Sequence, residues 1–168
     1  MEDYQETLWE WPGDVRNTAC RYSRGKLAGL RGDRERALAL MREAEQMASG
    51  ARQWRLLAKV HRLAFEGRIE EARRALQAFQ NDRMGLRVPD GEITLNIAEA
   101  YVLLGDNSKA MEMARLAFSQ GFGCTRWYET DAALAPLRSH PQWPWLLQHL
   151  NERQALYESR FRKENFGL

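Results

Sequence analysis

The chain carries one short pattern three times: a glycine followed five residues later by an alanine. The copies run over 32–37, 67–72 and 105–110, so their glycines are 35 and 38 residues apart. Repetition with a period of about 20–50 residues is typical of proteins that stack one supersecondary unit on the next. This repetition constrains the fold more strongly than the composition does.

Each glycine falls between two stretches with helical periodicity. Glycine adopts the left-handed conformation that ends a helix without the steric cost that other residues bear. An alanine at the start of the following helix lets two helix axes approach closely. The pattern therefore predicts helical hairpins with tight glycine turns. The stripes expected to pack after the turns are Ala37, Met41 and Ala44, then Ala72, Leu76 and Phe79, then Ala110, Ala114 and Ala117.

The hairpin pattern over residues 18–121 resembles the tetratricopeptide repeat, a pair of antiparallel helices about 34 residues long. The resemblance implies an all-α fold: an α-α superhelix of about three such hairpins with capping helices at both ends. The third copy matches the family best, with Ala98 and Tyr101 before the turn, Gly105 in it, and Ala110 and Ala117 after it.

The first two copies depart from the family pattern. The first has Gly25 and Ala28 where the family places a small residue and a tyrosine, and the second has Val60 and Leu63 there and Phe79 in place of the last alanine. Another kind of helical-hairpin array therefore stays open as an alternative. The family's tryptophan is replaced by Arg21, Leu56 and Thr94.

We expect a single tetratricopeptide-like domain over residues 1–168. Trp9 and Trp11 of its N-terminal segment are expected to cover the first hairpin. A longer loop is expected from Asn81 to Gly91, because Pro89 and the glycines there cannot continue a helix. The predicted parts are the N-terminal segment 1–17, repeats at 18–52, 53–90 and 91–123, and capping helices at 124–168.

The segment after residue 127 resembles those that close tetratricopeptide arrays in bacterial signalling proteins, including kinases and cyclases. It predicts a short helix, a proline-bounded turn and an apolar helix, followed by a charged helix over 152–163. A cap is needed because the end of an array would otherwise expose an apolar face. The residues expected to seal that face are Trp143, Trp145, Leu146 and Leu150.

Motifs that carry chemistry are absent from the sequence. His61, His140 and His149 form no pair at metal-ligand spacing, and Cys20 and Cys124 belong to no CxxC or Cys/His cluster. No glycine-rich phosphate loop, GxSxG elbow or HExxH motif occurs. We therefore expect no catalytic residue, no metal and no cofactor, and two reduced thiols. The lack of a signal peptide and of a run of about 20 apolar residues predicts a cytoplasmic location with no membrane contact.

Charge is distributed unevenly although the net charge is only +2. Residues 1–17 carry one base and five acids, 18–87 sixteen bases and eight acids, and 88–168 eight bases and ten acids. The basic middle favours an acidic protein or peptide as partner. Nucleic acid is disfavoured, because arginines at helical spacing usually form a solvated face; RNA is kept as a weaker alternative, since Trp54 and Phe65 lie among the bases and could stack on nucleotides.

In tetratricopeptide proteins the first helices of successive hairpins line a concave groove that binds an extended peptide or a helix. Aromatic residues beside charges are typical of such binding sites. The predicted function is therefore a non-catalytic adaptor or scaffold that binds a protein or peptide. The resemblance places eight residues on the groove: Tyr22, Lys26, Trp54, Leu57, His61, Glu92, Leu95 and Glu99.

One class of partner is disfavoured by the sequence, and two other interpretations of the chain stay open. Capture of a chaperone tail is disfavoured, because Tyr22, Glu92 and Glu99 stand on groove surface where that clamp uses basic and amide side chains. The chain could be the regulatory or structural C-terminal region of a larger bacterial signalling protein, as its array-closing segment indicates. An exposed cluster of tryptophans would instead favour a homo-oligomer.

Overall fold

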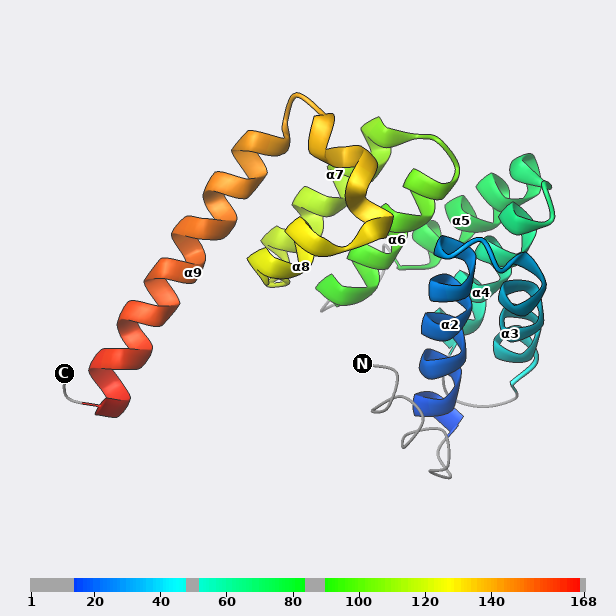
Figure 1. The fold of residues 1–168 in the computed structure, drawn as a ribbon, viewed down its shortest axis with the longest axis horizontal. Helices are drawn as coiled ribbons and strands as arrows, with labels where there is room; N and C mark the ends of the chain where they lie inside the picture. Colours follow the sequence, from blue (N-terminus) through cyan, green and yellow to red (C-terminus); the bar gives the residue numbers. More distant parts are fainter. Residues whose placement is uncertain (1–13, 48–51, 84–89, 167–168) are drawn as a thin grey trace. The chain divides into compact units, whose positions relative to one another are not determined.

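A computed structural model describes residues 14–47, 52–83 and 90–166, and all regular secondary structure in these residues is helical. The all-α prediction is therefore confirmed (Figure 1). The chain divides into two compact units, residues 1–87 and 88–168, and each is described by itself. The predicted boundary between the second and third repeats lies within three residues of this division, whereas the prediction of one domain stays a prediction.

Unit 1 consists of two antiparallel helical hairpins. The first joins α2 (Asp14–Leu30) to α3 (Arg34–Gln46), and the second joins α4 (Arg52–Phe65) to α5 (Ile69–Arg83). Gly32 and Gly67 turn the chain between the helices with φ of 82° and 80°, as predicted. Asp33 caps α3 by accepting a hydrogen bond from the backbone N–H of Arg36 at 3.1 Å. The predicted stripes after both turns are buried.

Helices α2 and α4 pack directly on each other through close contacts. The ring of Tyr22 lies 5.4 Å from that of Trp54, and farther along both helices Gly29 lies against Phe65. A Cβ at Gly29 would come within 2.3 Å of the Phe65 ring, so only glycine fits beneath that ring as it stands. Because the contacts advance together along both helices, α2 and α4 run in the same direction.

Unit 2 begins with a third hairpin, formed by α6 (Gly91–Leu103) and α7 (Asn107–Ser119). Gly105 turns the chain with φ of 76°, and Asp90 and Asp106 cap the two helices. The family-matching residues Ala98, Tyr101, Ala110 and Ala117 are all buried. Helix α6 is buried over almost its whole length, from residue 93 to residue 101, which agrees with its apolar sequence.

The capping region continues through α8 (Thr125–Thr130), the 3₁₀ helix η1 (Ala132–Ser139) and α9 (Trp143–Phe166). The Tyr128 hydroxyl lies 3.2 Å and 3.1 Å from the carbonyl oxygens of Ala114 and Phe122, so it ties α8 to the end of α7. Trp143, Leu146 and Leu150 are buried, as predicted.

Two predictions about this capping region are wrong. Trp145 was expected to seal the hairpin, but it is 42% exposed and lies between the Arg115 guanidinium, 4.3 Å from its ring centroid, and His149 at 4.0 Å. The apolar and charged helices are one continuous helix, α9, with Pro144 in its first turn, where the missing N–H breaks no helical bond. In Figure 1, α9 extends well beyond α8 and η1, and the end of α9 carries the exposed residues Leu156, Tyr157 and Phe161.

Several predicted boundaries also shift. Helix α2 begins at Asp14, inside the predicted N-terminal segment, and the predicted loop from Asn81 to Gly91 is shorter because α5 continues to Arg83 and Gly91 opens α6. The expected cover of the first hairpin by Trp9 and Trp11 lies outside the described residues.

Within the described parts of the chain, no helix combines the length and apolarity needed to cross a membrane. Those same parts contain no group of three or more histidine, cysteine, aspartate or glutamate side chains placed to hold a metal ion. Cys20 is a buried thiol and Cys124 an exposed one, and both are free.

Candidate protein-binding surface

Three of the predicted groove residues lie in the interior of unit 1. Tyr22 and Leu57 are fully buried, and His61 is only 2% exposed. The ring of Tyr22 touches those of Trp54 and His61, with centroids 5.4 Å and 5.1 Å apart. These side chains therefore hold α2 against α4 and offer no surface to a partner in this structure.

His61 is a neutral histidine of the core. Its Nδ1 lies 3.0 Å from the Leu57 carbonyl oxygen, so in the neutral tautomer that protonates Nδ1 it donates a hydrogen bond there. Burial lowers the pKa of His61 from 6.5 to about 4, the hydrogen bond to Leu57 acts in the opposite direction, and the nearby charge of Lys26 lowers the pKa further. At neutral pH this ring is an uncharged packing element.

The predicted groove residues of unit 2 divide in the same way. Leu95 and Glu99 are buried, at 1% and 2% exposure, whereas Glu92 is exposed at the start of α6, where its N–H donates to Asp90 at 2.9 Å. Of the eight predicted residues, Glu92 is exposed and only Lys26 and Trp54 are half-buried. Engagement of these three by a partner stays a prediction.

The accessible part of the leading helices in unit 1 is basic. Arg52, Arg55 and Lys59 recur at spacings of three and four residues and share one face of α4, which we call the α4 basic face. Arg52 pairs with Asp82 at 2.6 Å, but this pair is largely exposed and contributes little. The half-buried ring of Trp54 is next to Arg55 along the helix.

Arg55 and Lys59 form no ion pair with an acid among the residues that the structure describes, whereas Arg52 and Arg62 of the same helix do. Lys59 is exposed. The Nε of Arg55 is covered from solvent and donates no hydrogen bond within the described structure. A covered donor without an acceptor is costly, and a carboxylate is a strong acceptor for a guanidinium. These two cations are therefore a candidate place on α4 for an acidic ligand.

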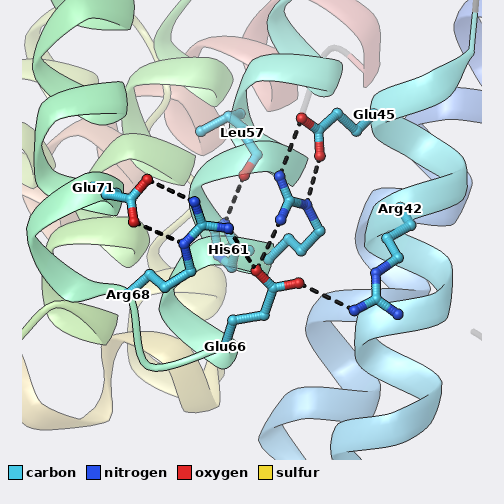
Figure 2. A network of polar contacts seen from close by, with 8 residues as sticks. Arg42, Glu45, Leu57, His61, Glu66, Arg68 and Glu71 are labelled. Carbon is cyan, nitrogen blue, oxygen red and sulfur yellow. Dashed lines mark hydrogen bonds and ion pairs between the residues drawn. The ribbon is translucent and has the colours of Figure 1, made fainter.

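Neighbouring arginines are instead committed to a network that ties three helices together (Figure 2). Arg62 of α4 donates to Glu45 of α3 at 2.6 Å and to Glu66 at 2.9 Å. Glu66 also accepts from Arg42 and Arg68, at 3.1 Å and 3.3 Å. Figure 2 shows Arg68 reaching on to Glu71 of α5, where the shortest contact is 2.6 Å.

The network shifts the ionisation of its members in the direction expected for paired charges. Burial alone would raise the pKa of Glu66, but hydrogen bonds from Arg42 and Arg62 lower it below its usual range. The hydrogen bond from Arg68 lowers the pKa of Glu71. These groups stay charged and paired at neutral pH, so the network is structural.

The network also bears on RNA binding. Nine basic residues between 52 and 87 could have met phosphates, yet four of them are in ion pairs and Arg83 stacks on the ring of Phe79 at 5.7 Å. A paired arginine must lose its carboxylate before it meets a phosphate, so the basic stretch offers fewer contacts than its composition indicates. Arg87 lies outside the described residues. The four paired residues are Arg52, Arg62, Arg68 and Arg73.

Comparison of this chain with protein-family models, curated proteins and solved structures finds no significant match.

Sequence reasoning placed Arg55 and Lys59 in the basic stretch but not among the predicted groove residues. Their helical spacing with Arg52 was the signal that could have found them, because it predicts one shared face of α4. The pairing of the other arginines depends on glutamates of α3 and of the turn before α5, which sequence spacing alone does not bring together.

Proposed function

We propose that the chain is a non-catalytic module of the tetratricopeptide type that binds an acidic segment of another protein on unit 1. The observation that carries the proposal is the α4 basic face, where Arg55 and Lys59 have no acidic partner within the described structure; the half-buried Trp54 belongs to the same first turns of α4. Carboxylates would meet the two cations, and an apolar or aromatic side chain would pack on the indole ring.

Hairpin repetition supports this proposal. Three glycine turns with positive φ, at residues 32, 67 and 105, are each followed by a buried stripe that begins with an alanine, as in arrays that serve as binding scaffolds. Stacked hairpins present extended surfaces of helix, and surface charge on them selects partners of opposite sign.

A displayed library of random 12-residue peptides would test this function. The wild-type chain should enrich peptides that contain several acids and at least one aromatic residue. The double variant R55E/K59E should lose that enrichment, whereas R73E/R74E on α5, which makes the same change of charge, should keep it. A library that enriches no peptide, or that enriches the same peptides on R55E/K59E, would rule out the proposed surface.

The exposed end of α9 favours a second candidate function, that of a region which docks on another part of a larger signalling protein or on a second copy. Leu156 and Tyr157 are 48% and 59% exposed on a helix whose first turns bury Trp143, Leu146 and Leu150. Sedimentation of the wild type and of L156E/Y157E separates these cases. Self-association that is lost in the variant supports a homo-oligomer, and a wild-type chain that is monomeric at about 100 μM excludes it at that affinity.

A further inference from the structure

The exposed indole ring of Trp145 in unit 2 is held between two basic side chains. The Arg115 guanidinium lies 4.3 Å from the ring centroid, and the imidazole of His149 lies 4.0 Å from it, tilted by 31°. His149 is itself fixed, because its Nδ1 lies 2.8 Å from the Trp145 carbonyl oxygen of the same helix. The ring is therefore held in one orientation although 42% of Trp145 is exposed.

Packing of the core does not account for this arrangement. Trp143 and Leu146 are buried and already seal the start of α9, whereas Trp145 on the same helix is exposed. Three other cations that lie over aromatic rings cover buried rings: Arg83 with Phe79, Lys109 with Tyr101, and Arg153 with Phe118. Tryptophan and arginine side chains that are accessible on a surface are the residues that most often carry the binding energy of an interface.

Arg115 has hydrogen-bonding groups left for a ligand. One N–H of its guanidinium donates to Oε1 of Gln142 at 3.3 Å. Within the part of the chain that the structure describes, its other N–H groups and the amide N–H groups of Gln142 have no acceptor. A guanidinium that stacks on a ring keeps its N–H groups at the edge of the stack, where a carboxylate can accept two hydrogen bonds from them.

We propose that Arg115, Gln142 and Trp145 form a peptide-binding site on unit 2. A glutamate or aspartate side chain of another protein accepts hydrogen bonds from Arg115 and Gln142, and an apolar side chain of the same segment packs against the exposed edge of the indole. A carboxylate complements the charge of Arg115, which no acid of the described residues neutralises in an ion pair. His149 holds the ring in place and does not touch the ligand. The site shares no residue with the α4 basic face, so it goes beyond the proposed function.

Two short peptides would test this site on the full-length chain. In an extended peptide, side chains two residues apart point to the same side, so acetyl-Glu-Ala-Leu-amide presents a carboxylate and an apolar group together. It should shift the indole N–H signal of Trp145, assigned by its absence from W145F, in a saturable manner with a Kd of about 1 mM. Acetyl-Gln-Ala-Leu-amide, which lacks the charge, should bind at least about tenfold more weakly. This comparison needs no substitution near the site.

Substitutions then locate the contact. R115M should weaken binding of the glutamate peptide about tenfold, whereas R126M, which removes an exposed arginine of α8 in the same unit, should leave it unchanged. R115K keeps the charge but lacks the planar fork, and its affinity should fall between those of R115M and the wild type. The variant R55E/K59E should bind as the wild type does, so a failure of the proposed function would leave this inference standing. No saturable shift up to about 20 mM peptide, equal binding of the two peptides, or equal losses in R115M and R126M would overturn it.

Discussion

At the scale of single residues, His61 couples the folding of unit 1 to pH. Its pKa in the folded chain is about 4, against 6.5 for an unperturbed histidine, because burial between α2 and α4 disfavours the imidazolium. The folded state thus binds fewer protons than the unfolded state between these two values. The contribution of neutral His61 to the free energy of unfolding is therefore fully present above pH 6.5, and it decreases as the pH falls toward 4.

Replacing His61 with leucine should remove this dependence. In the wild type, the free energy of unfolding should fall by up to about 1.4 kcal/mol for each pH unit between 6.5 and 4, and H61L should be nearly flat down to about pH 5. Urea unfolding at pH 7, 6 and 5, with hydrogen exchange to localise the effect to α2 and α4, measures the slope. H149L, which alters a histidine of unit 2, serves as the control. A slope in H61L equal to that of the wild type would contradict the assignment.

At the scale of the helical elements, the hairpin turns are the part of the fold that the sequence predicts best. A glycine followed by a small-residue stripe identifies both the turn and the buried face, because the left-handed backbone and the close helix approach each admit few residue types. The burial of Tyr22 and His61 could not be predicted, because it depends on how far α4 is displaced along α2. The exposure of Trp145 likewise depends on the direction in which α9 leaves η1.

Turn chemistry gives a prediction at Gly105. Alanine at φ of 76° is strained, although a Cβ there meets no atom within 4 Å, so the cost is conformational rather than steric. We expect G105A to lower the free energy of unfolding by about 1 kcal/mol and G105N by less, because asparagine tolerates this conformation. Thermal unfolding followed by circular dichroism measures the difference. Equal losses for the two variants would show that strain is not the cause.

The ion-pair network gives a second prediction at this scale. R62M leaves Glu45 and Glu66 facing each other without the half-buried guanidinium between them, and it should cost about 2 kcal/mol. R42M is the matched control, because it removes the same charge from a side chain that is 54% exposed, and it should cost less than about 0.5 kcal/mol. Urea unfolding at pH 7 compares the two. Similar losses would mean that Arg62 contributes packing rather than charge.

At the scale of the whole molecule, the chain divides into two compact units, and its description as one domain stays a prediction. Unit 1 contains two of the predicted repeats and the α4 basic face, whereas unit 2 contains the third repeat and the capping helices. Each unit has its own buried core, with Leu57 and Leu76 in the first and Leu134 and Leu146 in the second. Units with separate cores can open independently even when one chain joins them.

Matched glycine variants in the two units would measure that independence. Gly67 and Gly105 have nearly the same turn geometry, with φ of 80° and 76°, so alanine at either position should cost a similar free energy. We expect G67A to speed amide exchange across residues 52–83 and to leave residues 91–161 unchanged, and G105A to do the reverse. Hydrogen exchange resolved by peptide reads both units in one experiment. If either variant accelerates exchange throughout the chain, the two units unfold as one cooperative domain, because strain introduced in one unit would then destabilise both.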